Sequence, residues 1–129
     1  MQKLSGSISA VMAVASALLL AAFVSQIARA RALPELTTPY HAVALTNGLV
    51  YFGKVEGLGD SFLMLRDVYY VQNRPNPDTK QTATVLVKRG GEWHGPDRMM
   101  INREHVLLIE PVKDDSQVGK LIAEQSKPR

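Results

Sequence analysis

"VALTNGLVYFGKVEGLGDSFLML", residues 43–65, alternates apolar and polar side chains and is interrupted twice by turn residues. Asn47-Gly48 is a strong hairpin signal, because both central positions of such a turn need positive φ. The GLGDS segment, residues 57–61, closes a second hairpin onto an apolar run that continues to residue 72. This stretch therefore predicts three consecutive antiparallel strands.

Two further strands are expected downstream, at residues 83–89 (ATVLVKR) and 99–112 (MMINREHVLLIEPV), the second after one helical turn. Five short strands bounded by Gly and Pro predict a mainly β domain over residues 40–112, a small barrel. One face supplies the predicted core: Val43, Leu45, Tyr51, Val55, Leu63, Leu65, Val85, Val87, Val106 and Leu108. The alternate positions are also partly apolar: Val50, Phe52, Phe62, Met64, Leu107 and Ile109. Either the strands bend strongly, or another subunit or the C-terminal tail covers this second face.

A short amphipathic helix and a tail are expected over residues 113–129. Val118, Leu121 and Ile122 would share one helical face, and Asp115 or Ser116 would cap the helix. Gly119 weakens this prediction, since glycine costs a helix about 1 kcal/mol relative to alanine. The helix either folds back over the second apolar face of the barrel or docks on a partner.

The amino-terminal part contains an uncharged apolar run, ISAVMAVASALLLAAFVSQIA, residues 8–28, after a tail of residues 1–7. As a helix it would be about 30 Å long, which matches the hydrocarbon core of a bilayer. Two interpretations remain: a retained single-pass anchor, or a signal peptide cleaved near Ala30 with release of the domain. The run is longer than a typical signal core, which favours the anchor, with residues 29–39 as a linker.

The charge and the residue types exclude several functions. Residues 37–112 hold eight Lys and Arg residues against eight Asp and Glu residues, so this part is neutral. The chain has no cysteine, its three histidines lack the paired spacing of a metal site, and no nucleophile motif surrounds Ser61. We therefore expect no enzyme, cofactor, metal or small-molecule ligand.

The domain resembles the Sm-like family of small barrels. Its first motif is matched in order by Val43, Leu45, Asn47-Gly48, Tyr51, Gly53, Val55, Asp60, Leu63 and Leu65. Its second motif is similar to INREHVLLIEP, residues 101–111. The resemblance implies an Sm-like fold and, as an alternative function, RNA binding. The RNA-contacting positions differ, however: Met64 replaces a base-reading Asn, and Arg103 stands at a Gly position. With a neutral domain, we do not expect nucleic acid as a partner.

Four blocks also resemble an uncharacterised bacterial family that pairs one membrane span with a small β domain. They are NGLVYFGKVE, LRDVYYVQ, HGPDRMMINREHVL and KDD. This resemblance implies a single-pass protein of the cell membrane with an extracytoplasmic domain; a cytoplasmic domain is the alternative, because the basic residues flanking the span are nearly balanced.

A partner-binding patch is a further hypothesis, based on residues 92–104, which contain the only Trp and two arginines. Its candidate residues are Trp93, His94, Asp97, Arg98 and Arg103, together with Phe52 from the second apolar face. The structural alternative is that Trp93 caps the barrel while the arginines pair with Asp60, Asp67 or Glu104. The sequence thus predicts a membrane-anchored, non-enzymatic module that binds the bilayer and either a protein partner or itself.

Overall fold

The computed structural model describes the backbone of residues 2–30 and 32–128 and the side chains of residues 5–28 and 32–128. The chain forms two compact units, Met1–Pro34 and Glu35–Arg129, which are treated separately below. The side chains of the expected cleavage site, at residues 29–31, lie outside the described part.

The first unit is one helix, α1 (Gln2–Ala30), which begins inside the expected tail and continues beyond residue 28. Its Ser5–Ala28 stretch, with a mean hydropathy of 2.3, is long and apolar enough to cross a membrane. All side chains described here are exposed, and the Ser25 hydroxyl donates to the Ala22 carbonyl at 2.8 Å. The Ser25 hydroxyl is therefore hydrogen-bonded within the helix. A signal sequence would share this length and composition.

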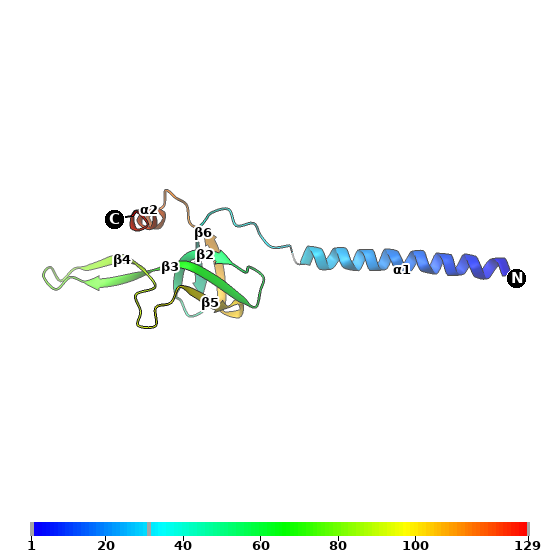
Figure 1. Cartoon of the computed structure of the whole chain (residues 1–129), viewed down its shortest axis with the longest axis horizontal. Coiled ribbons are helices and arrows are strands. Elements are labelled where there is room, and N and C mark those ends of the chain that lie inside the picture. The colour runs from blue at the N-terminus through cyan, green and yellow to red at the C-terminus, as the bar shows by residue number, and fades with distance from the viewer. Residues whose placement is uncertain (1, 31, 129) are drawn as a thin grey trace. The chain divides into compact units, whose positions relative to one another are not determined.

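The second unit is an antiparallel sheet followed by a short helix (Figure 1). Its elements are β1 (His41–Leu45), β2 (Val50–Glu56), β3 (Phe62–Pro75), β4 (Thr82–Lys88), β5 (Arg98–Asn102), η1 (Arg103–His105), β6 (Val106–Pro111) and α2 (Gln117–Gln125). The strand order is β4-β3-β2-β1-β6, and β5 pairs with the first half of β3. The β3–β4 hairpin extends beyond the rest of the sheet as a two-stranded ribbon (Figure 1).

The sheet has six strands where the sequence predicted five, because the expected last strand is divided. Asn102 accepts a hydrogen bond from the Glu104 amide at 3.1 Å and starts the single turn of η1, which separates β5 from β6. β5 pairs with β3, whereas β6 pairs with β1. The mainly β prediction is confirmed, but the sheet is not closed.

A bulge at Asp67 bends β3 and changes which strands it meets. Asp67 has a φ of +48°, in the left-handed region, and β2 shifts its register opposite this point. Such an extra residue disrupts the ladder locally and increases the bend of the strand. Gly53 lies opposite the bulge, and a Cβ there would be 3.0 Å from the carbonyl oxygen of Arg66. The missing side chain at Gly53 therefore allows backbone to approach backbone at the bulge.

The main apolar core lies on the inner face of the bent strands. Val43 and Leu65 are completely buried there, with Leu63, Val68 and Ile101 around them. Ile109 also packs inside, whereas Leu108 is 42% exposed, which is the reverse of the predicted assignment. The reason is a register shift between Ala44 and Leu45, which breaks the alternation that the prediction assumed in β6.

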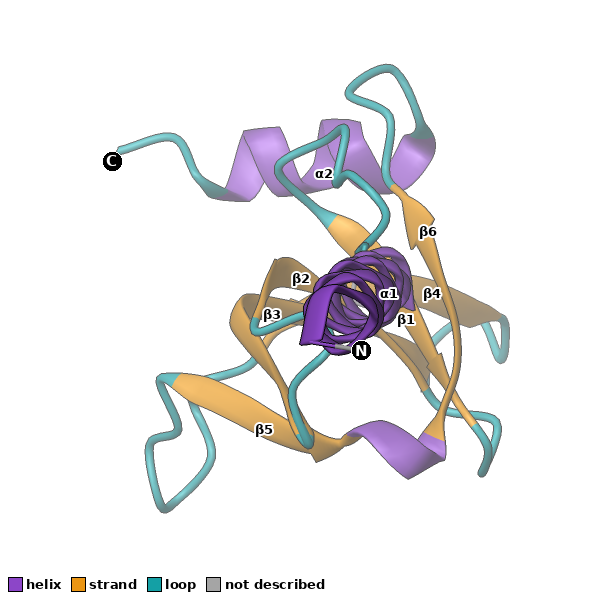
Figure 2. Ribbon diagram, turned by 90° about the vertical axis from the view of Figure 1, so that its right-hand side faces the viewer, coloured by secondary structure: helices purple, strands orange, loops and turns teal. Residues whose placement is uncertain are grey.

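A second apolar cluster lies between the outer face of the sheet and α2 (Figure 2). Tyr69, Leu86 and Ile122 are buried in it, and Phe52, Val118 and Leu121 pack against them. The helix therefore folds back over the second face, one of the two alternatives left by the sequence. In β4 the buried residue is Leu86, and the predicted core residues Val85 and Val87 are only half-buried. The cause is local: Leu86 pairs with Val71 on the outer face, where α2 covers it.

Candidate functional site

The six residues predicted to bind a partner do not form one site. Trp93 and His94 are exposed in the loop between β4 and β5, and Asp97 pairs with Arg98 at 2.9 Å where β5 begins. Arg103 donates from Nη1 to the Gly59 carbonyl at 3.1 Å, so it holds the β2–β3 turn. Phe52 packs beneath α2. The alternative roles expected for Trp93 and the arginines are wrong: Trp93 caps nothing, and neither Arg98 nor Arg103 pairs with Asp60, Asp67 or Glu104.

Glu92 fixes the loop that carries Trp93. Its carboxylate accepts from the Arg89 guanidinium at 2.9 Å and from the Gly90 amide at 2.8 Å. Its carbonyl oxygen accepts from the Gly95 amide at 2.8 Å, which closes a turn around Trp93. The Gly90 amide lowers the pKa of the Glu92 carboxyl most, with smaller contributions from the amide of Glu92 itself and from Arg89. The loop conformation therefore depends on an ionised Glu92.

Arg89 joins this loop to the sheet. Its amide donates to the Val68 carbonyl at 2.7 Å, and its guanidinium lies 5.8 Å from the centre of the Tyr51 ring. The same guanidinium contacts the Met99 sulfur at 2.9 Å. The loop thus leaves the domain from an anchored base and presents Trp93 to solvent.

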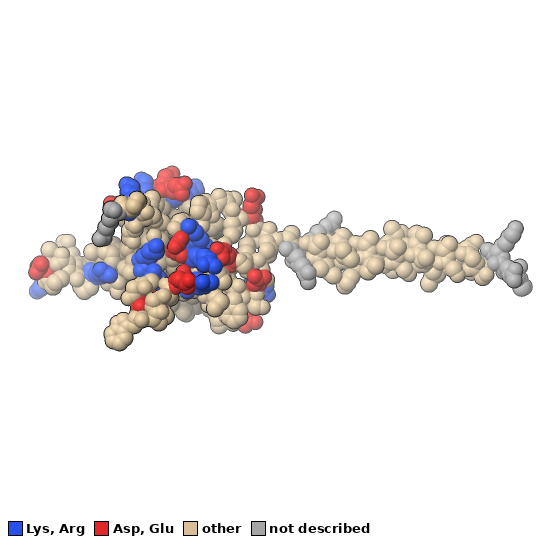
Figure 3. All heavy atoms as spheres, in the orientation of Figure 1, with Lys and Arg blue, Asp and Glu red and all other residues tan. Residues whose placement is uncertain are grey.

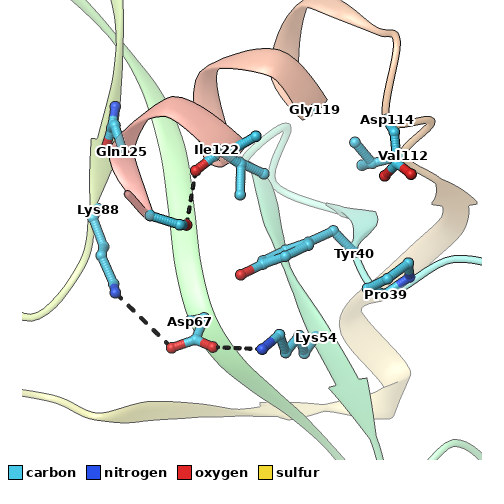
Figure 4. A pocket seen from close by; sticks show the side chains of 12 residues that line it. Pro39, Tyr40, Lys54, Asp67, Lys88, Val112, Asp114, Gly119, Ile122 and Gln125 are labelled. Carbon is cyan, nitrogen blue, oxygen red and sulfur yellow. Dashed lines mark hydrogen bonds and ion pairs between the residues drawn. The ribbon is translucent and has the colours of Figure 1, made fainter. Parts of the chain in front are cut away.

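A second candidate site lies between the outer face of the sheet and α2 (Figure 4). The Asp67 carboxylate points into it from the bulge, with the Lys54 ammonium at 3.0 Å and the Lys88 ammonium at 4.0 Å. The cavity has a volume of about 580 Å³ and is lined by Pro39, Tyr40, Lys54, Asp67, Lys88, Val112, Asp114, Gly119, Ile122, Ala123, Gln125 and Ser126. Three different strands supply the charged groups, so no local motif could have predicted them.

Tyr40 is the aromatic residue that lines this cavity. Tyr40 meets Tyr69 edge to face with ring centres 6.2 Å apart, and Lys54 lies 5.5 Å from the centre of the Tyr40 ring. Burial raises the pKa of the Tyr40 hydroxyl, and the hydrogen bond to Asp67 raises the pKa of Lys54. Both groups are therefore fully protonated at neutral pH, and neither is prepared to act as a base.

The cavity shows no arrangement for catalysis among the described residues. The Ser126 hydroxyl donates to the Ile122 carbonyl at 2.8 Å, and Asp67 is engaged by lysines. No group of three His, Cys, Asp or Glu side chains in the described part of the chain could hold a metal ion. The site can exchange ion pairs with a charged ligand, but it contains no nucleophile next to a base.

The third candidate is apolar and lies beside α2 on the same outer face. Ala44 pairs with both Leu108 and Val50, so these three side chains share a face. Val50 and Val71 line a groove of about 430 Å³ with Gly48, Leu49, Tyr51, Phe52 and Tyr70. Val50 is 40% and Val71 48% exposed. The helix therefore covers the Tyr69 end of the apolar face and leaves the Val50 end in solvent.

Charged side chains do not segregate on the face seen in Figure 3, where Lys and Arg lie next to Asp and Glu. Ion pairs account for this mixture: Arg66 pairs with Glu56 at 3.0 Å, in addition to the pairs described above. No family model matches the sequence, and no curated protein matches it.

Proposed function

We propose that this protein is a membrane-anchored, non-enzymatic module that self-associates through the outer face of its sheet. The uncovered apolar row carries the proposal: Leu108, Ala44, Val50 and Val71 continue the surface on which α2 packs. Contiguous apolar surface of this kind usually marks an interaction site, because leaving it in water is unfavourable. α1 would serve as the anchor and the sheet domain as the interacting part, on the extracytoplasmic side.

A second copy of this chain is the occupant we propose. The row contains no charged side chain, and interfaces between identical subunits are more apolar than those of transient complexes. A surface of this kind can also pair with itself about a twofold axis, the commonest symmetry of homo-oligomers. Anchoring in one bilayer would place the copies at high effective concentration, so that modest affinity would be sufficient.

The Sm-like small barrel is the finer description of the fold that we propose. Two features support it: β1 pairs with both β2 and β6, and a single helical turn joins β5 to β6. The interleaved charges of the domain give no support to the RNA-binding alternative, since phosphate contacts require an excess of Lys and Arg on the surface.

The absence of cysteine makes a direct test simple, because any single introduced cysteine is the only thiol in the chain. We expect Val71→Cys and Leu108→Cys to form disulfide-linked dimers in native membranes under mild oxidation. Ser61→Cys is the matched control, since Ser61 is exposed at the far end of the β2–β3 hairpin. It should remain monomeric under the same conditions.

Two results would count against the proposal. Equal cross-linking of Ser61→Cys would indicate random collision, and an absence of dimers in all three variants would exclude this face as the contact. Alkaline carbonate extraction tests the anchor separately, because a spanning helix keeps the protein in the membrane pellet whereas a cleaved chain is released.

A further inference from the structure

The loop between β4 and β5 presents the only tryptophan of the chain to solvent. Trp93 is fully exposed, whereas Tyr69, the largest buried aromatic residue, is almost completely enclosed. Figures 1 and 2 show the loop projecting from the body of the domain. A large apolar ring in water is unfavourable, so its position requires a physical explanation.

The exposure of Trp93 is built into the loop. Glu92, immediately before it, bonds Arg89 and the Gly90 amide, while the Gly95 amide closes the turn behind it. Arg89 in turn is bonded to Val68 and packs on Tyr51. Three anchored contacts thus hold the backbone on both sides of one outward-facing indole.

We infer that Trp93 docks at the headgroup boundary of the bilayer that holds α1, giving the domain a second membrane contact. This inference rests on the proposed anchoring. Indole suits that boundary because its ring is apolar while its N–H can still hydrogen-bond, and tryptophan is enriched at both membrane–water interfaces. Its neighbours His94 and Gly95 are small or polar, so one ring can enter while the rest of the loop remains hydrated.

A lipid surface fits this loop better than a protein surface does. Protein interfaces bury a cluster of apolar anchors, but residues 89–98 contain no large apolar side chain besides Trp93. The charges of the loop are paired internally, Arg89 with Glu92 and Arg98 with Asp97. The contact should therefore depend on the acyl boundary and not on anionic headgroups.

The short connection between α1 and the sheet means that even a weak contact between Trp93 and the bilayer would be populated. Ten residues separate Ala30 from His41, and they can span at most about 36 Å. A domain of this size is roughly 30 Å across, so every face of it stays within reach of the bilayer. Tethering of this kind gives an effective concentration in the ~mM range, at which docking of a single side chain becomes populated.

The fluorescence of Trp93 can be measured without labelling, because it is the only tryptophan in the sequence. The full-length protein is reconstituted into phosphatidylcholine vesicles with plain or brominated acyl chains, and its tryptophan emission is recorded with and without aqueous iodide. We expect brominated lipid to remove most of the emission and iodide to remove little. The result should be the same when anionic lipid is added.

The matched control exchanges two aromatic residues in one chain, Trp93→Phe with Phe62→Trp. Phe62 is 56% exposed and pairs with Asn102, at the end of β5 away from the loop. Its tryptophan should be quenched by iodide and not by brominated lipid. The exchange keeps the composition and the anchor and moves the tryptophan to another solvent-accessible position, so it tests the position of the ring.

Each other outcome is informative. Emission of Trp93 that is quenched by iodide alone, in protein that resists carbonate extraction, overturns the inference and leaves the anchor intact. A blue shift that disappears when the protein is diluted in lipid would assign the contact to a second copy and also overturn it. Loss of the protein from the vesicles on carbonate extraction would instead be a failure of the proposed anchor.

Discussion

Gly119 is unfavourable for the helix considered alone but favourable for the packing of the domain. By helix propensity alone, alanine at this position of α2 would be better by about 1 kcal/mol. A Cβ at Gly119, however, would collide with the carbonyl oxygen of Lys113 and lie 3.0 Å from that of Asp114. The glycine is needed because the segment before α2 turns closely against the first helical turn.

We therefore predict that Gly119→Ala destabilises the domain, by about 1–3 kcal/mol, as overpacking usually does. Lys120→Ala, at the exposed next position, should change the free energy of unfolding by less than about 0.5 kcal/mol. Urea unfolding of the fragment from Glu35 onward measures both. A stabilising Gly119→Ala would mean that the approach of Lys113 relaxes at little cost.

His41 is a second single residue with a predictable effect: it makes the free energy of unfolding depend on pH. It is only 3% exposed, its Nδ1 has no hydrogen-bond partner in the described structure, and burial lowers its pKa. The unfolded chain therefore binds a proton more readily than the folded domain below pH ~6.5. Stability contributed by the neutral ring is present above that pH and is lost as the pH falls toward the lower folded-state pKa.

We predict that the wild-type domain loses more unfolding free energy between pH 7 and pH 5 than His41→Gln, which cannot titrate. Parallel urea titrations at the two pH values give this difference directly. An identical pH dependence in both proteins would show that His41 is equally protonated in the folded and unfolded states.

At the scale of elements, α2 is held by the sheet and not by its own propensity. A nine-residue helix is marginal alone, even with the Ser116 hydroxyl capping the Gly119 amide at 3.0 Å. Tertiary contacts supply the rest of the stability of the helix. Ile122 is buried against Tyr69 and Leu86, and Gln125 donates to the Leu86 carbonyl at 2.9 Å.

Ile122→Ser should therefore release α2 while leaving the strands folded, because burial of such a side chain contributes roughly 1.5–3 kcal/mol. Native-state hydrogen exchange should show lost protection at the Gly119 and Lys120 amides and unchanged protection at Val43 and Leu65. Lys120→Ser is the exposed control. Uniform loss of protection would show that α2 and the sheet unfold as one unit.

Elements marked by a short sequence motif could be predicted. Features that depend on contacts between residues far apart in the sequence could not. Asn47-Gly48 marked the first hairpin, although only Gly48 has the positive φ expected at both positions. Ser116 with the apolar spacing of Val118 and Ile122 marked α2. The division of the last strand could have been recognised from Asn102, which caps η1. The bulge at Asp67 depends on the strands on either side, so the Lys54–Asp67–Lys88 cluster was invisible in sequence.

The same distinction applies to the candidate sites. The stretch around Trp93 was interpreted as a partner-binding patch or, alternatively, as a cap on the barrel, and the full exposure of Trp93 contradicts the cap. Whether a loop aromatic packs or projects is decided by hydrogen bonds such as those of Glu92, whose partners are themselves placed by the fold. Of the apolar row only Val50 was expected on the second face, since Leu108 had been assigned to the core. The position of α2 shows which part of the row is uncovered.

For the whole molecule, the inner core should carry most of the stability. Leu65 is completely buried among Val43, Leu63, Val68 and Ile101, so Leu65→Ala should cost about 2–5 kcal/mol. This is a large part of the stability of a small domain. Leu107→Ala, at a position that is 67% exposed, should cost far less.

Thermal unfolding followed by circular dichroism checks both variants, in the fragment from Glu35 onward, whose spectrum should be dominated by β structure. Equal melting temperatures for Leu65→Ala and the wild type would contradict the assignment of the core. A mainly helical spectrum would contradict the fold.

The pairing of β1 with β6 has a consequence for the order in which the chain can fold. The hairpins β1–β2, β2–β3 and β3–β4 join neighbouring segments, but β6 reaches back across almost the whole domain to β1. Closing so large a loop has a high entropic cost and is slow compared with hairpin formation. A chain emerging from a ribosome therefore exposes one edge of β1 until Pro111 has been synthesised. Neighbouring nascent chains would then compete with β6 for that edge, and the time needed to synthesise the residues between β1 and β6 sets how long they can do so.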